Sequence, residues 1–130
     1  MAFRKCFLLV FILVLAACQS DNSTSTRGKL FLVQVSNETF TMFVTDPATI
    51  QLAIDNFDGK NARHPSGKIA LGHGGFNGHH SWHYIPETVE MVEVSMELCD
   101  GLPSYVDDHA NDFLASGYCP WNGRILRVGS

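Results

Sequence analysis

Apolar and polar residues alternate with a period of two in two neighbouring segments, residues 29–36 and residues 39–45. Such alternation, together with many β-branched and aromatic residues, predicts strands with one buried face. The residues expected on the buried faces are Phe31, Val33 and Val35 in the first strand and Phe40, Met42 and Val44 in the second. Because only a short polar connection separates the two strands, we expect them to pair as an antiparallel hairpin.

The pattern changes to a helical period after the hairpin. Asp46 can accept hydrogen bonds from free backbone N–H groups, and Pro47 suits the first helical position. Apolar residues follow at the spacing i, i+3, i+4 and i+7, which predicts a helix with one apolar face that ends at Gly59. That face consists of Ile50, Ala53, Ile54 and Phe57. The polar residues 60–67 are predicted to form a loop.

Two further strands are expected in the middle of the chain. Residues 68–72 form a short apolar run, and residues 89–99 alternate so regularly that they predict one long strand. The residues expected on its buried face are Val92, Val94, Met96 and Leu98. Glu93 and Glu97 would then lie on the opposite face. A helix is the alternative for this segment, but its best apolar stripe would include the glutamates.

The C-terminal segment again changes period. Ser104 and Asp107 resemble a helix-capping box. Apolar residues then recur at helical spacing, at Val106, Ala110, Phe113 and Leu114. A second helix is therefore predicted to end at Gly117, and residues 123–128 are predicted to be the last strand. The resulting order, ββα, ββ and αβ, predicts an α+β fold with a mostly antiparallel sheet and two packed helices.

The N-terminus carries an export pattern. Arg4 and Lys5 precede the apolar residues 7–17, and this run of roughly eleven residues is too short for a membrane-spanning helix, which needs about 20. A short apolar run behind basic residues is typical of a signal peptide. The sequence LAAC that ends at Cys18 resembles the lipobox of bacterial lipoproteins.

This resemblance implies that residues 1–17 are a lipoprotein signal peptide and that Cys18 carries acyl chains such as palmitate, which anchor the protein to a membrane. An ordinary signal peptide cut before Cys18 is the alternative. Residues 18–28 lack large apolar side chains and are expected to be a flexible tether. Gln19, in place of an aspartate, implies sorting to the outer membrane of a cell envelope. Residues 29–130 are then predicted to form a single domain.

Charge and cysteine content narrow the possible partners. Without Arg4 and Lys5, seven Lys and Arg remain against 13 Asp and Glu, a net charge of −6. No basic cluster is left, so a nucleic-acid partner is not expected. Cys99 and Cys119 are an even pair in an exported domain and are predicted to form a disulfide. A redox-active or metal-binding thiol pair is the alternative, although the C-x-x-C spacing is absent.

Residues 72–86 hold four of the six histidines, together with four glycines. These histidines are His73, His79, His80 and His83. Imidazole is the commonest transition-metal ligand, and on an extended chain His79 and His83 share one side, so these two are the candidate zinc ligands. The HExxH signature is absent. The alternative is a set of exposed loop histidines, with His83 packed against an aromatic ring or bonded to a carboxylate.

Acid–base catalysis has weaker support. Glu93 and Glu97 would have Cβ atoms about 13 Å apart on a strand, which exceeds the separation of paired glycosidase carboxylates. Ser81 or Ser95 could combine with His83 and Glu97 in a Ser–His–acid set, but no G-x-S-x-G motif is present. A small metal-assisted hydrolase centred on His83 therefore remains the alternative function.

Four runs of sequence together resemble a family of small exported domains. They are FLVQVSNETFTMFVTDP (residues 31–47), SWHYIP (81–86), ELCDGLPSYV (97–106) and YCPW (118–121). The family is named after the N-terminal domain of a slime-mould binding protein, and the resemblance covers nearly all of residues 30–128. It implies one compact domain with the Cys99–Cys119 pair, and it implies no activity. The residues that match its pattern are Trp82, His83, Glu97, Asp100 and Trp121, whereas His73, His79 and His80 look particular to this chain.

Aromatic side chains on a rigid scaffold commonly form binding sites. The surface expected to bind consists of Phe76, Trp82, His83, Tyr84 and Trp121. We therefore expect a lipid-anchored binding or interaction module of the cell envelope that has no catalytic activity and no cofactor. Its partner would be an envelope protein, a peptide or a glycan. A hydrolase or a zinc-binding lipoprotein centred on His83 is the alternative.

Overall fold

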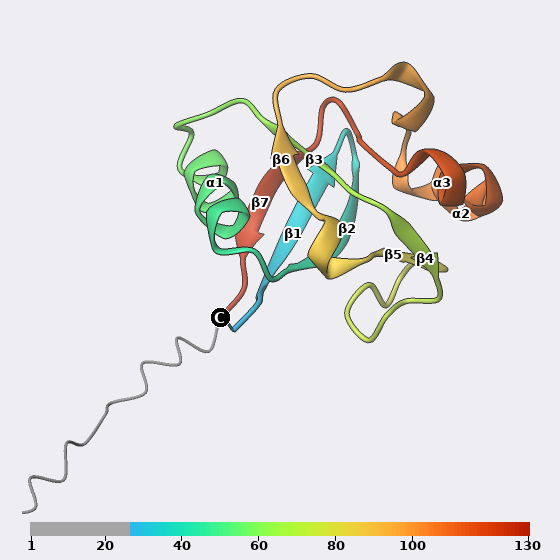
Figure 1. Ribbon diagram of the computed structural model, residues 1–130, viewed down its shortest axis with the longest axis horizontal. Helices are drawn as coiled ribbons and strands as arrows, with labels where there is room; N and C mark the ends of the chain where they lie inside the picture. The colour runs from blue at the N-terminus through green and yellow to red at the C-terminus, as the bar shows by residue number, and fades with distance from the viewer. Residues whose placement is uncertain (1–26) are drawn as a thin grey trace, which may run out of the picture.

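The computed structural model describes residues 27–130 (Figure 1). The predicted signal peptide and Cys18 lie outside the described residues. The main sheet has three antiparallel strands in the order β2-β1-β7. Its strands are β1 (Lys29–Val35), β2 (Glu38–Val44) and β7 (Arg124–Val128). Two short antiparallel ladders join β3 (His64–Ser66) to β6 (Glu90–Val92) and β4 (Ile69–Leu71) to β5 (Trp82–Tyr84).

Helices cover the sheet from two sides. In Figure 1, α1 lies beside β7, and α2 and α3 lie together at the opposite side of the molecule. The α-helices are α1 (Pro47–Phe57), α2 (Pro103–Asp108) and α3 (Ala110–Ser116), and the 3₁₀ turns are η1 (Pro86–Thr88) and η2 (Glu97–Cys99). The predicted α+β class with mostly antiparallel strands is confirmed, with three helices in place of two. Among residues 27–130, no helix is long and apolar enough to cross a membrane.

The N-terminal hairpin and the first helix form as their local patterns predict. Six alternating apolar residues of β1 and β2 are buried, and the register pairs the ends of the hairpin, Val35 with Glu38. Asp46 is the N-cap of α1 and accepts hydrogen bonds from both the backbone N and the Oγ1 of Thr49, each at 2.8 Å. Phe57, predicted on the apolar face of the helix, is half exposed. It is the last helical residue, where the helix runs beyond the sheet.

Four aromatic rings fill the core beneath β2. Phe40, Trp82, Tyr84 and Tyr118 are buried, and the distances between their ring centroids run from 5.1 to 6.0 Å. Their polar atoms are satisfied within the core, since the Tyr84 hydroxyl donates to the Tyr118 carbonyl at 2.8 Å. Tilted and edge-on ring contacts at such distances add to the stabilisation from burial alone.

The predicted long strand over residues 89–99 is wrong. Only Glu90–Val92 is a strand, because its partner β3 begins at His64, opposite Val92, and no other strand of the described residues continues the ladder. The residues expected to be buried beyond this point, Val94, Met96 and Leu98, are 85%, 66% and 80% exposed. The alternation therefore reflects a surface segment, which we call the 93–98 segment.

Two other predicted boundaries change because side chains find tertiary partners. The predicted second helix is broken at His109, and Ser104 does not cap it, because its N and Oγ donate to the Glu38 carboxylate at 2.8 and 2.6 Å. Asp107 likewise bonds to another segment, described below. The predicted loop over residues 60–67 contains β3, which pairs with β6. A three-residue strand carries too little alternation to be recognised from sequence.

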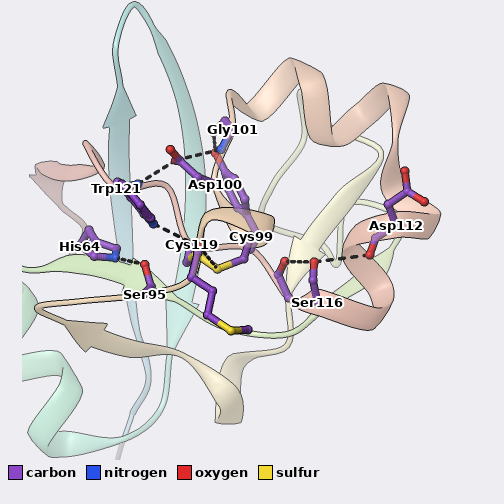
Figure 2. The surroundings of a disulfide bond; sticks show 12 residues. His64, Ser95, Cys99, Asp100, Gly101, Asp112, Ser116, Cys119 and Trp121 are labelled. Carbon is purple, nitrogen blue, oxygen red and sulfur yellow. Dashed lines mark hydrogen bonds between the residues drawn. A yellow bond between two sulfur atoms is a disulfide. The ribbon is translucent and has the colours of Figure 1, made fainter.

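The predicted disulfide is confirmed. Cys99 and Cys119 are bonded, with their Cα atoms 5.0 Å apart, and the bond joins η2 to the loop that precedes β7 (Figure 2). Both residues are buried. The bond closes a loop of 20 residues and so restricts the unfolded chain, by about 3 kcal/mol in the chain-entropy model.

Candidate functional site

The histidine-rich loop, residues 72–81, covers the free edge of the main sheet. β2 is an edge strand, so its outward-facing N–H and C=O groups have no neighbouring strand to bond among the described residues. The backbone N of Thr41 donates to Asn77 Oδ1 at 3.0 Å, and His80 Nε2 donates to the carbonyl oxygen of Thr39 at 2.8 Å. Two side chains of the loop thus take the place of a fourth strand.

His80 also ties this loop to α2. Its Nδ1 lies 2.7 Å from Asp107 Oδ2, and the N and Oγ of Ser81 donate to Asp107 Oδ1 at 2.7 and 2.9 Å. Partial burial raises the pKa of Asp107, but the hydrogen bonds from His80 and Ser81 outweigh this effect and hold the pKa below its ordinary value. Asp107 therefore serves as a structural acceptor, and the loop is fixed at both the sheet edge and the helix.

His83 and His79, the candidate zinc ligands, occupy different settings. His83 Nδ1 donates to the carbonyl oxygen of Gly72 at 2.7 Å, and its ring packs edge-on against Phe76, with centroids 5.5 Å apart. His79 is exposed and lines a hollow over the outer face of β1. Within residues 27–130, no group of three or more His, Cys, Asp or Glu side chains is placed to hold a metal ion. The packing of His83 matches the structural alternative given for it above.

The aromatic residues predicted for binding divide between core and surface. Trp82 and Tyr84 are wholly buried, because β5 alternates and both face Phe40, so a partner cannot contact them in this fold. Phe76 is half-buried against Phe43 and His83. Their place in a glycine-rich, histidine-rich stretch suggested exposure that the structure does not give them. Trp121 is the member of the predicted set that presents a large exposed ring.

Trp121 is held firmly although 45% of its surface is exposed. Its backbone N donates to Asp100 Oδ1 at 3.0 Å, and its Nε1 donates to the carbonyl oxygen of Met96 at 3.3 Å (Figure 2). It follows Cys119 by two residues, so the disulfide restrains the same loop. A ring that is fixed by two hydrogen bonds and still exposed loses little conformational entropy when a partner covers it.

The surface around Trp121 is apolar and hollowed. Three adjoining hollows of about 370, 260 and 270 Å³ share the Trp121 side chain as part of their lining. Next to it lie the exposed apolar residues of the 93–98 segment. We call the set Val94, Met96, Leu98, Leu102 and Trp121 the Trp121 surface. Clustered exposed apolar residues on a soluble domain commonly mark an interaction site.

This surface lies at the end of β1 that is farthest from the start of the domain. Val35 and Ser36, which follow along β1, line one of the hollows together with Trp121, and Asn122 Nδ2 donates to Ser36 Oγ at 2.8 Å. The chain enters the sheet at Lys29, six residues before Val35, which corresponds to about 20 Å along a strand. The entry point of the domain and the Trp121 surface are therefore at opposite ends of the sheet.

A serine–histidine pair lies beside the same surface. His64 Nε2 is 2.6 Å from Ser95 Oγ (Figure 2), and the neighbouring Arg63 pairs with Glu93 at 3.1 Å. Sequence analysis grouped Ser95 with His83 and Glu97, whereas the structure pairs it with His64. No local signal could have shown this, since 31 residues separate the two partners and His64 sits in a segment that reads as a loop.

Comparison with protein families adds the relationship that geometry does not provide. The family model for the N-terminal domain of the slime-mould binding protein matches residues 28–130. The chain belongs to this family. The domain-family resemblance identified in the sequence is thus confirmed. Neither the curated proteins nor the solved structures that were compared contain a match.

The match to this binding-protein N-terminal domain covers every element of the described fold, from β1 to β7. Both the edge-capping loop and the Trp121 surface are therefore parts of the family domain. Two of the family-like runs meet near Trp121, because Asp100 of the third run accepts the backbone N–H of Trp121 in the fourth. The family pattern thus coincides here with a contact between distant parts of the chain.

Proposed function

We propose that this protein is a binding module of the cell envelope, anchored in the outer membrane by acylated Cys18, and that it binds a protein partner through the Trp121 surface. The observation that carries the proposal is the exposed apolar 93–98 segment beside a fixed, half-exposed tryptophan. The export pattern of residues 1–18 supports the location.

The arrangement of the domain suits display from a membrane. The tether reaches the domain at β1, and the Trp121 surface is at the far end of that strand. An anchor at one end of the sheet would keep the other end directed away from the lipid. A partner in the envelope could then reach the Trp121 surface without competition from the membrane.

The chemistry of the surface favours a protein partner over a glycan. Val94, Met96 and Leu98 offer aliphatic and thioether groups, and full burial of such a side chain contributes about 1.5–3 kcal/mol. Glu93 and Glu97 flank these residues and are exposed. Complementary partners would present apolar side chains next to lysine or arginine, which also speeds encounter with an acidic domain.

Site-specific photo-cross-linking in intact cells tests the surface. We expect a photoreactive amino acid at Leu98 to form a defined protein adduct, and the same group at Leu126 to form none. Leu126 is the matched control, because it is an exposed leucine on β7. Adding Met96→Glu to the Leu98 probe should reduce the adduct at least tenfold. Equal adducts at both positions, or an adduct insensitive to Met96→Glu, would rule out this surface.

The anchor is tested separately by Cys18→Ser. Metabolic labelling with palmitate should be lost, and the protein should move from the membrane fraction to the soluble fraction. An unlabelled wild-type protein, or a variant that remains in the outer membrane, would contradict the anchoring. Neither result bears on the surface, because the cross-linking is read from the folded domain.

The zinc-centred alternatives have no geometric support in the described part of the chain. His83 has one ring nitrogen occupied by the carbonyl oxygen of Gly72, and no carboxylate of residues 27–130 is bonded to it. Metal analysis of the purified protein with and without His83→Ala provides the test. Stoichiometric zinc that is lost with His83→Ala would establish a metal site and overturn the account of His83 as a packing residue.

A further inference from the structure

We propose that Ser95 is an activated nucleophile with His64 as its general base, and that it accepts acyl groups from esters that carry an apolar acyl chain. This activity goes beyond binding and departs from the expectation of a non-catalytic module. It needs no residue of the histidine-rich loop and no metal. The pair lies where the 93–98 segment passes the start of β3.

The geometry of the pair is that of a base and the proton it removes. Ser95 Oγ and His64 Nε2 are 2.6 Å apart, at the short end of the range in which a histidine deprotonates a hydroxyl (Figure 2). His64 is buried, whereas Ser95 is half-buried. The base is therefore shielded from water, and the nucleophile is accessible.

The surroundings keep the base in its working form. Burial lowers the pKa of His64, while the negative charge of Asp100 raises it and does not offset the burial. The imidazole is consequently neutral near pH 7 and can accept a proton. The nearby carboxylate of Asp100 stabilises the imidazolium that forms when the proton arrives. Asp100 is a positioning residue, since it bonds to Gly101 and Trp121 and not to His64.

The pair opens into a hollow with room for a small acyl chain. This hollow of about 260 Å³ is lined by both members of the pair together with Ala62, Glu93, Val94 and Trp121. The apolar groups of Ala62, Val94 and Trp121 would contact the chain. An ester whose carbonyl carbon reaches Ser95 can therefore leave its apolar part on the Trp121 side.

The reaction balances with water as the co-reactant. Ser95 Oγ forms a bond to the carbonyl carbon, and its proton passes to His64 Nε2. The ester C–O bond then breaks, and the departing alcohol takes that proton from His64. Water attacks the resulting Ser95 ester in the same manner, which releases the carboxylic acid and restores the hydroxyl.

An alkyl fluorophosphonate is a direct probe of such a serine. The Ser95 oxygen would form a bond to phosphorus, fluoride would leave, and the proton would pass to His64. Full-length protein in detergent should acquire one adduct, which peptide mass spectrometry should place on Ser95. The labelling rate should fall as the pH is lowered through the pKa of His64. Ser95→Ala should abolish labelling.

His64→Gln separates catalysis from structure, because the amide can keep a hydrogen bond to Ser95 but cannot act as a base. We expect labelling about 100-fold slower, in line with the usual contribution of a general base. Ser104→Ala is the matched control and should label as wild type, since Ser104 Oγ is bonded to the Glu38 carboxylate and to no imidazole of the described residues.

Thermal unfolding of each variant shows that the domain is folded during labelling. The proposal is overturned if folded wild-type protein acquires no adduct, if the adduct lies on another residue, or if His64→Gln reacts at the wild-type rate. Each of these outcomes leaves the cross-linking test of the Trp121 surface unaffected.

Discussion

Replacing Asn77 by alanine should lower the free energy of unfolding by about 2–4 kcal/mol, because it leaves two backbone groups unpaired. Asn77 is only 2% exposed. Its Nδ2 donates to the buried carbonyl oxygen of Trp82 at 2.8 Å, and its Oδ1 accepts from the backbone N of Thr41 at 3.0 Å. Each backbone group left without a partner costs about 1–3 kcal/mol, and Thr41, which water can reach, should lie at the low end.

Urea unfolding at pH 7, followed by tryptophan fluorescence, measures the loss. For a domain of about 100 residues the melting temperature should fall by roughly 10–20 °C. Asn122→Ala is the matched control, because Asn122 is exposed and its Nδ2 bonds only to Ser36 Oγ among the described residues, so the cost should be within about 0.5 kcal/mol. Amide exchange at Thr41 should accelerate in the Asn77 variant alone.

Asn77→Asp refines the same test. The carboxylate retains an acceptor for Thr41 but has no donor for the Trp82 carbonyl oxygen, and it buries a charge. Its destabilisation should therefore equal or exceed that of the alanine variant. A cost below about 1 kcal/mol for Asn77→Ala, or a cost equal to that of Asn122→Ala, would refute the role of this loop as the cap of the sheet edge.

Three further outcomes are expected. Replacing both cysteines of the disulfide by serine should cost about 3 kcal/mol in urea unfolding; an unchanged midpoint would show that the loop does not restrain the unfolded chain. The pKa values of His64 and Asp107 are lower in the folded state, so the unfolded state binds more protons, and stability should fall as the pH drops below about 6.5 and again below about 4. His64→Gln should remove only the first step; a flat profile between pH 7 and 5 would contradict this. Gly74→Ala should destabilise more than Gly75→Ala, because both have positive φ but only the Cβ at Gly74 meets the His83 ring, at 2.5 Å; equal costs would mean that this ring moves freely.

Local patterns were sufficient where neighbouring residues make the decisive contacts. The hairpin of β1 and β2 joins strands two residues apart, and the N-cap of α1 bonds residues three apart. For such elements the period of apolar residues and the capping residue contain the information that folding uses. The disulfide was predictable for another reason, since only two cysteines remain after the signal segment.

The same reasoning misread the 93–98 segment. Alternation at Val94, Met96 and Leu98 is the pattern of a half-buried strand, but a strand also needs a partner, and β3 ends the ladder at His64. Whether an alternating segment is paired or exposed depends on residues about 30 positions away. Trp121 was recognised as a binding residue, whereas the apolar residues that surround it on the surface were assigned to the core.

The sequence by itself determined the α+β class, the hairpin, the first helix, the disulfide and the family, because each follows from local spacing or from residue identity. Only the tertiary structure decided what the histidine-rich stretch does. It brought His80 to Asp107 and His64 to Ser95 across 27 and 31 residues, and it buried Trp82 and Tyr84 beneath β2. Such contacts arise when separate elements pack on one core, and the spacing of residues along the chain does not encode them.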